Sequence, residues 1–99
     1  MDKIKLVIWD LDETFWEGTL SETTIKKIDW NINFVKKLTE NGIVNSICSK
    51  NDFNEAKRCL LDLMIWDYFI FPEIQWSSKG QLVKSIIEKC QLRDNNVLF

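Results

Sequence analysis

Three carboxylates crowd one short segment near the start of the sequence, KLVIWDLDETF, in which Asp10, Asp12 and Glu13 directly follow the apolar run of residues 4–9. Like charges at this spacing repel one another unless a cation, or the counter-charges that accompany an anionic substrate, offset the repulsion. A purely structural role for so much negative charge at the end of a buried strand is hard to assign. The segment therefore indicates chemistry with a metal ion or with an anionic group.

The sequence contains no histidine. This absence excludes Ser-His-Asp and Cys-His catalysis, zinc sites built on imidazole, and phosphohistidine chemistry. Any catalysis must use carboxylates, hydroxyls, lysine, thiols or a metal ion held by oxygen atoms. A carboxylate fits this requirement, because it is ionised at neutral pH and needs no histidine to activate it.

Composition narrows the class of protein further. The chain has 99 residues, a net charge of −2, 45% hydrophobic residues and 28% charged residues, as expected for one soluble domain. The slight acidity gives no basic surface for nucleic acid, no apolar run reaches the ~20 residues that span a membrane, and no signal peptide is visible. Cys48, Cys59 and Cys90 are odd in number and widely spaced, which predicts reduced thiols in a cytoplasmic protein.

Apolar runs of strand character alternate with amphipathic segments, which predicts an α/β fold with a parallel sheet and right-handed crossovers. Gly42 is the expected terminator of the first helix, and Asn51 or Asp52 the expected N-cap of the second. The expected strands lie at residues 4–9, 43–48, 67–71 and 96–99, the helices at 31–42, 51–64 and 79–92, and an irregular hairpin or flap at 13–22.

Polar side chains follow the first three expected strands. Asp10 and Asp12 follow the first, Ser49 follows the second in CSKND, and Lys79 follows the third in PEIQWSSKG, where it opens a helix. Ligands of parallel α/β sheets bind beyond the carboxyl ends of the strands. We therefore expect an acid pair, a hydroxyl and an ammonium group to meet at one edge of the sheet.

This ordered set resembles the haloacid dehalogenase (HAD) superfamily of phosphohydrolases. The superfamily's apolar strand with D-x-D-x-T matches LVIWDLDET, its strand ending in Ser or Thr matches IVNSICS, and its helix-opening Lys matches SSKGQLVKSI. Three longer stretches, WDLDETFWEGTL, ICSKND and IQWSSKGQLVKSI, look like the FkbH-like, subclass IIIC branch, with departures at Glu13, Phe15 and Gly80. The resemblance covers nearly the whole chain and implies a Rossmann-like three-layer fold.

The resemblance also implies a role for each matching residue. Asp10 would be the nucleophile and would give a carboxylate oxygen to Mg²⁺, to which Asp12 would add its backbone carbonyl. Asp12 would be the general acid and then the general base. Ser49 and Lys79 would bind the phosphoryl group, and Thr14 belongs to the same phosphate-binding motif, although it is expected to stabilise the turn after the strand. The side chain of Trp16 could either pack or contact substrate.

The implied activity is that of a Mg²⁺-dependent phosphohydrolase acting through a phospho-aspartate on a phosphorylated metabolite or a protein-borne phosphate. One alternative is the FkbH-like transfer of a glyceryl group to an acyl carrier protein. Another is a catalytically inactive HAD domain that acts only in binding. A phospho-receiver domain is disfavoured, because it needs an acceptor aspartate after the third strand, where this chain has FIFPE.

The segments between the motifs are too short for an inserted cap domain, so we expect a capless site that accepts a bulky substrate or is closed by a partner subunit in an oligomer. We also expect a single domain over residues 1–99 that lacks the C-terminal end of the HAD core. In the family an acidic pair follows the fourth strand and completes the metal site, whereas this sequence ends at Phe99. Weak binding of Mg²⁺ by this chain alone is the expected consequence.

Overall fold

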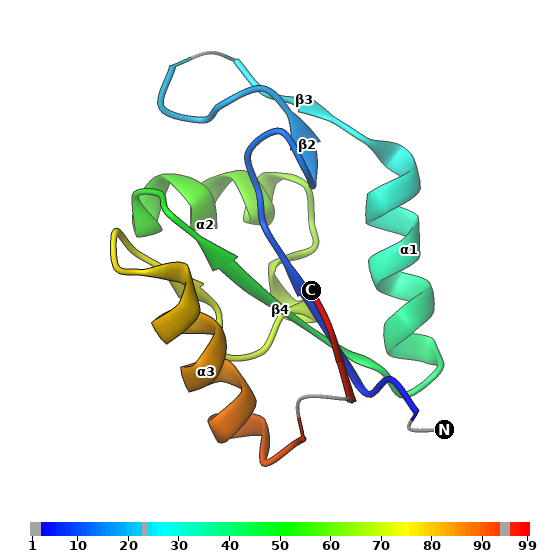
Figure 1. Ribbon diagram of the computed structural model, residues 1–99. Coiled ribbons are helices and arrows are strands. Elements are labelled where there is room, and N and C mark those ends of the chain that lie inside the picture. Colours follow the sequence, from blue (N-terminus) through cyan, green and yellow to red (C-terminus); the bar gives the residue numbers. More distant parts are fainter. Residues whose placement is uncertain (1–2, 23, 94–95) are drawn as a thin grey trace.

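Four parallel strands form a central sheet in the order β5–β4–β1–β6 (Figure 1). The structure, a computed structural model, describes residues 3–22, 24–93 and 96–99. The strands are β1 (Leu6–Trp9), β4 (Val44–Ser49), β5 (Glu73–Ile74) and β6 (Val97–Leu98). β1 and β4 pair in register from Leu6 opposite Val44 to Trp9 opposite Ile47. The predicted α/β fold with a parallel sheet is confirmed.

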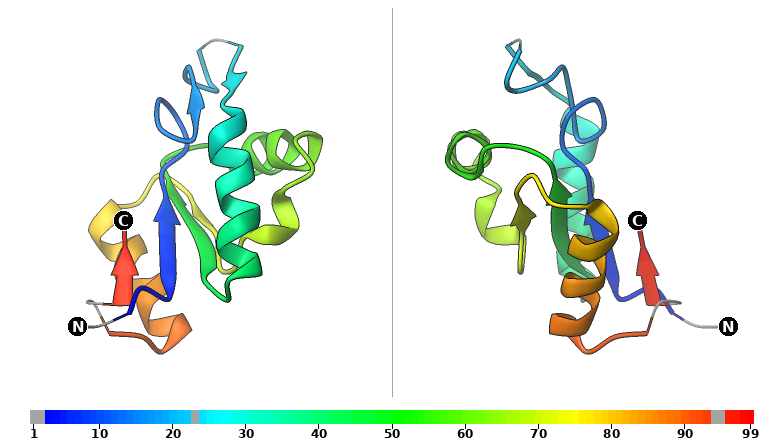
Figure 2. Two further views of the ribbon diagram at one scale, coloured as in Figure 1. Left: turned by 90° about the vertical axis from the view of Figure 1, so that its right-hand side faces the viewer. Right: turned by 60° about the vertical axis from the view of Figure 1, so that its left-hand side comes forward.

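Helices cover both faces of this sheet (Figures 1 and 2). Helices α1 (Asp29–Glu40) and α2 (Phe53–Asp62) lie on one face, and α3 (Lys79–Cys90) lies on the other. Each face has its own apolar core, because alternate residues of β1 and β4 point to opposite sides. Ile47 packs with residues of α1 and α2, whereas Leu6 and Ile8 pack against Leu82 and Ile86 of α3. No helix in the described part of the chain is long and apolar enough to cross a membrane.

Some helix ends follow local sequence signals, whereas the starts of α1 and α3 have no side-chain cap. The carboxylate of Asp52 accepts a hydrogen bond from the backbone N–H of Glu55 at 3.0 Å, so Asp52 is the N-cap of α2, one of the two predicted residues. Helix α1 terminates before Gly42, whose φ of +78° suits a residue without a side chain. Its start lies two residues before the predicted one, at Asp29, and the sequence carries no signal for this boundary because Ile28 provides no side-chain cap.

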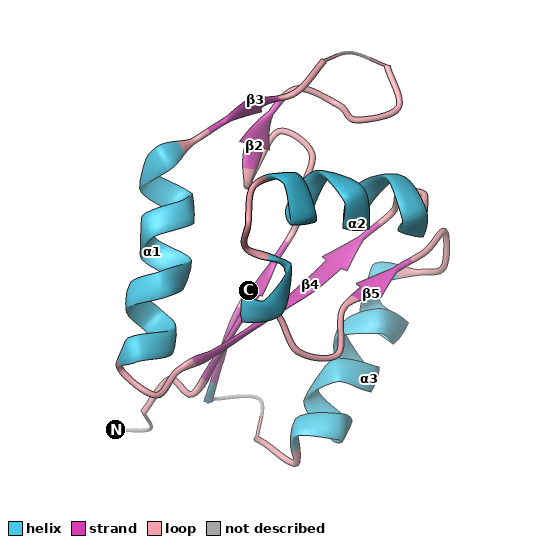
Figure 3. Cartoon of the chain, turned by 180° about the vertical axis from the view of Figure 1, so that it is seen from behind, coloured by secondary structure: helices cyan, strands magenta, loops and turns pink. Residues whose placement is uncertain are grey.

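The third strand is an element that the sequence placed wrongly (Figure 3). Residues 67–71 were expected as a strand, but Trp66–Tyr68 form a 3₁₀ turn, η1, and only Phe69 makes an isolated parallel bridge with Asn45. Phe71 then takes a φ of +45°, which an extended strand cannot contain. The third strand of the sheet is therefore β5, which pairs with Cys48 and Ser49 beyond Pro72.

A small hairpin connects β1 to α1 at the carboxyl end of the sheet. Strands β2 (Trp16–Glu17) and β3 (Lys26–Lys27) pair antiparallel and project above the strand ends, as Figure 1 shows. This hairpin includes most of the flap predicted at residues 13–22 but extends beyond it to Lys27, and it is called the flap below. Within the described residues, neither this connection nor the one between β4 and α3 contains a further folded domain, which agrees with the expected capless fold.

Candidate active site

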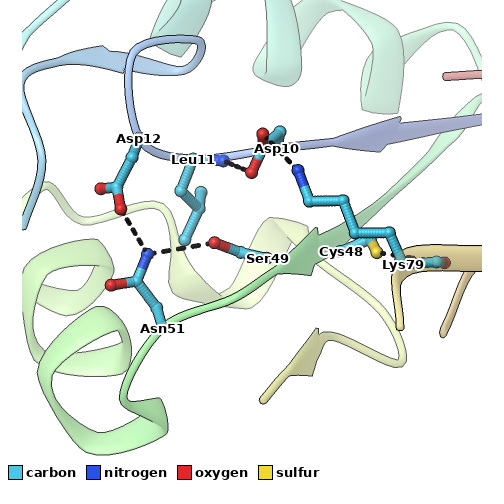
Figure 4. A network of polar contacts seen from close by, with 7 residues as sticks. All are labelled: Asp10, Leu11, Asp12, Cys48, Ser49, Asn51 and Lys79. Atoms are coloured by element: carbon cyan, nitrogen blue, oxygen red, sulfur yellow. Dashed lines mark hydrogen bonds and ion pairs between the residues drawn. The ribbon is translucent and has the colours of Figure 1, made fainter. Parts of the chain in front are cut away.

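The predicted side chains lie beyond the carboxyl ends of β1 and β4 and at the start of α3 (Figure 4). They form two adjacent groups, one made by Asp10 and Lys79 and the other by Asp12, Asn51 and Ser49. Within the described residues, no hydrogen bond or ion pair joins the two groups. They come close because β1 and β4 pair directly, so that their ends present both groups side by side.

Asp10 and Lys79 form an ion pair across the sheet edge. The Lys79 Nζ lies 2.7 Å from Asp10 Oδ2, and the backbone N–H of Leu11 donates to Asp10 Oδ1 at 2.8 Å. Lys79 is the first residue of α3, where a positive charge opposes the helix dipole, so the pairing with Asp10 offsets an unfavourable position. The Asp10 side chain remains 29% exposed and the Lys79 side chain 39%, which leaves the carboxylate accessible to a ligand.

Asp12 is held by hydrogen-bond donors from the flap and from Asn51, which lies between β4 and α2. Its Oδ1 accepts hydrogen bonds from the Trp16 indole Nε1 and the Leu20 backbone N–H, each at 3.0 Å. Its Oδ2 accepts a hydrogen bond from the Asn51 amide at 2.9 Å. Trp16 is fully buried, so of the two roles left open for it, packing is the one observed. The indole thereby fixes the orientation of the Asp12 carboxylate and ties the flap to β1.

Ser49 and Asn51 lie under Asp12 and are both almost fully buried. The Asn51 amide that donates to Asp12 also donates to Ser49 Oγ at 3.1 Å. The sequence places Asn51 at the second strand end and offers it as an alternative helix cap, but it assigns Asn51 no role in the site; the structure gives the cap to Asp52. The available signal was its place two residues after Ser49, which puts it at the same strand end.

Thr14 lies apart from both groups. It is exposed, its backbone N–H donates to the Leu11 carbonyl at 3.2 Å, and its own carbonyl accepts a hydrogen bond from the Asn31 amide at 3.2 Å. These are turn-stabilising contacts of the backbone. A role in phosphate binding, like the catalytic roles of the other site residues, stays a prediction.

Glu13, between the two groups and the flap, adopts a left-handed backbone conformation with φ +57°. This conformation is costly for most residues but accessible to asparagine, whose short polar side chain bonds locally. We therefore expect Glu13→Asn to raise the free energy of unfolding by roughly 0.5–1 kcal/mol. Chemical denaturation monitored by circular dichroism measures the change.

The matched control is Glu22→Asn, which removes the same charge from another exposed turn residue that has no positive φ. Its stability should stay within about 0.5 kcal/mol of the unchanged chain. Equal shifts in the two variants would attribute the gain to charge and not to the backbone at Glu13.

The cysteines are packing residues, as expected. Cys48 is buried beside the site, and its Sγ approaches the Lys79 carbonyl at 3.8 Å. Burial raises the pKa of the Cys48 thiol; Lys79 acts in the opposite direction, while Asp10 and Glu73 raise it further. The thiol therefore stays protonated at neutral pH and is no nucleophile. All three cysteines of the chain are free.

The donor set at this edge fits a hard cation that keeps several water ligands. Within the described part of the chain, no group of three or more His, Cys, Asp or Glu side chains is arranged to hold a metal ion. Asp12 accepts three hydrogen bonds, whereas Asp10 accepts one on each oxygen and remains 29% exposed, so Asp10 is the more accessible carboxylate. One carboxylate with backbone carbonyl and water oxygens suits Mg²⁺, which dehydrates reluctantly.

Solved structures share this fold. The chain superposes on the N-terminal part of the protein BF1531 from Bacteroides fragilis, described as containing a phosphatase domain complexed with Mg, with a TM-score of 0.83 and 22% identity over 96% of this chain. It has the fold of a phosphatase domain. An uncharacterized protein from Listeria monocytogenes serotype 4b gives a TM-score of 0.77 and 19% identity over 95% of this chain.

The match extends over only part of each neighbour. The chain spans 30% of the Bacteroides chain and 65% of the Listeria chain. No protein-family model matches the sequence, and no curated protein matches it. At these identities the likeness establishes the fold, and the chemistry of the site has to be argued from its residues.

Proposed function

We propose that the chain is a Mg²⁺-dependent phosphohydrolase of the HAD superfamily that transfers a phosphoryl group to Asp10 and then to water. The observation that carries the proposal is the 2.7 Å ion pair of Asp10 with Lys79, next to an Asp12 carboxylate held in place by three hydrogen bonds. The fold shared with a phosphatase domain supports it. The motifs around Asp10, Ser49 and Lys79 support the FkbH-like branch within the superfamily.

The first step forms a phospho-aspartate. A carboxylate oxygen of Asp10 attacks phosphorus, the bond from phosphorus to the leaving alcohol oxygen breaks, and protonated Asp12 gives its proton to that oxygen. Lys79 offsets the charge of Asp10 and of the phosphoryl oxygens, which would otherwise repel each other. The exposed fraction of Asp10 gives the incoming phosphate access.

The second step returns the enzyme to its starting state. Water attacks phosphorus while Asp12, now ionised, accepts a proton from it, and the bond between phosphorus and the Asp10 oxygen breaks to release inorganic phosphate. One residue can serve as acid and then as base because the first step leaves it deprotonated. The hydrogen bonds from Trp16 and Leu20 keep Asp12 oriented through both steps.

The metal would be held by a carboxylate oxygen of Asp10 and the backbone carbonyl of Asp12. When bound, Mg²⁺ neutralises charge on the phosphoryl oxygens. Ser49, with the backbone N–H groups that open α2, would donate hydrogen bonds to the phosphoryl group. Without an inserted cap over the strand ends, the site suits a bulky phosphorylated metabolite or a protein-borne phosphate.

The proposal predicts Mg²⁺-dependent release of inorganic phosphate from an aryl phosphate such as phenyl phosphate. Removing Mg²⁺ with a chelator should lower the rate by ~10²-fold or more, because metal-ion charge stabilisation contributes several kcal/mol to the transition state. Colorimetric phosphate detection measures the rate, and re-addition of Mg²⁺ serves as the control. Phosphate release that is equal with and without the chelator would contradict a metal-dependent mechanism, and no release at all would leave a binding role for the domain.

A further inference from the structure

We infer that Asn51 is a positioning residue that acts through Asp12 and Ser49. The inference rests on the proposed phosphatase function and deepens it, since it adds a residue on which that reaction depends. Its basis is a single side-chain amide that holds both the proton-transfer group and a phosphate-binding group of the site (Figure 4).

The Asn51 Nδ2 carries two hydrogens, and each has its own acceptor. One is donated to Asp12 Oδ2 at 2.9 Å and the other to Ser49 Oγ at 3.1 Å. This orientation of the amide suits the reaction, because the Asp12 carboxylate that acts as the base in the second step can only accept hydrogen bonds and must face the nitrogen. Asn51 is only 2% exposed, so neither hydrogen bond is exchanged readily for one to water.

The contact with Asp12 decides which oxygen can exchange a proton. Among the contacts of the described residues, Asp12 Oδ1 accepts two hydrogen bonds and Oδ2 accepts one. A carboxylate oxygen has two lone pairs, so Oδ1 is saturated and Oδ2 retains one site. The proton of both chemical steps therefore passes through Oδ2, the oxygen that Asn51 holds.

The contact with Ser49 decides where its hydroxyl hydrogen points. Because Ser49 Oγ accepts from Asn51, its own O–H is free to donate elsewhere, and a phosphoryl oxygen is the acceptor that the proposed reaction brings. Asp52 already caps α2, so the buried amide of Asn51 is not needed as a helix cap. A buried polar group at this strand end is thus committed to the two site residues.

Two variants remove these donors. Asn51→Asp keeps the size of the side chain but replaces its NH₂ with an oxygen, and Asn51→Ala removes the group. We expect kcat/KM for phenyl phosphate, which has a poor leaving group, to fall by ~10²-fold in both. With 4-nitrophenyl phosphate, whose leaving group needs little protonation, the fall should be less than ~10-fold. A fold defect would lower kcat/KM equally for the two substrates.

A matched control and a swap separate positioning from folding. Asn33→Asp makes the same change at an exposed position of α1. It should leave kcat/KM for each aryl phosphate within about twofold of that of the unchanged chain. The double variant Asp12→Asn with Asn51→Asp restores a donor–acceptor pair between the two positions. Its melting temperature should therefore recover relative to Asn51→Asp alone, while its turnover should not.

The outcomes distinguish the inference from the function on which it rests. Normal turnover by Asn51→Ala, or equal losses on the two aryl phosphates, would overturn the role of Asn51 while leaving the phosphatase intact. An unchanged chain that releases no phosphate from either substrate would overturn both. A steeper loss on phenyl phosphate, together with thermal recovery in the swap, is the expected result.

Discussion

Asp10→Asn is expected to reduce phosphate release by ~10⁴-fold or more, the largest effect of any substitution in this chain. The amide group of asparagine is a weak nucleophile and cannot form the acyl phosphate that the proposed reaction requires. The substitution also removes the negative charge that pairs with Lys79 at 2.7 Å. Steady-state phosphate release and a phosphoprotein assay with radiolabelled substrate measure the two consequences, loss of turnover and loss of covalent label.

The matched control for this variant is Asp29→Asn. Asp29 is exposed and also faces a lysine, with Lys27 Nζ 3.5 Å away, so the substitution makes the same change in charge and breaks a longer, more exposed ion pair. Its turnover should stay within about twofold of the unchanged chain. If Asp10→Asn retains full turnover while remaining folded, the nucleophile is another group and the proposed mechanism is wrong.

The parts of the fold that could be predicted are those governed by local signals. Strand β1 and strand β4 are buried runs of β-forming residues, and Asp52 and Gly42 mark helix ends through their own side-chain or backbone chemistry. Once the two strands are predicted, their carboxyl ends are known, so Asp10 and Ser49 could be placed at those ends from the sequence. These predictions needed no knowledge of long-range packing.

The parts that could not be predicted depend on contacts between distant segments. The run of residues 67–71 has strand composition, yet the positive φ of Phe71 and the short pairing with β4 place the strand at β5. Periodicity carries no information on such a backbone reversal. The hydrogen bonds from Trp16 and Asn51 to Asp12 likewise depend on how the flap and β4 approach β1, which no local pattern specifies.

Lys79→Met is expected to lower kcat/KM by ~10³-fold, the second of the two largest effects. Methionine has a similar length and no charge, so the variant leaves Asp10 and the phosphate dianion to approach each other without the nearby cation. Because Lys79 touches Asp10 and is proposed to touch the phosphoryl group, both kcat and KM should change. Steady-state kinetics with phenyl phosphate at saturating Mg²⁺ resolve the two constants.

The stability of Lys79→Met identifies the origin of the loss. The ion pair is part-exposed and the lysine opposes the dipole of α3, so the free energy of unfolding should change by no more than about 1 kcal/mol. Lys89→Met is the control, since Lys89 lies on the same helix and pairs with Glu73 at 2.8 Å, and its turnover should stay within about threefold. A similar loss in both variants would assign the effect to general helix electrostatics. A loss confined to Lys79, with stability preserved, is what a cation that serves the reaction and not the fold requires.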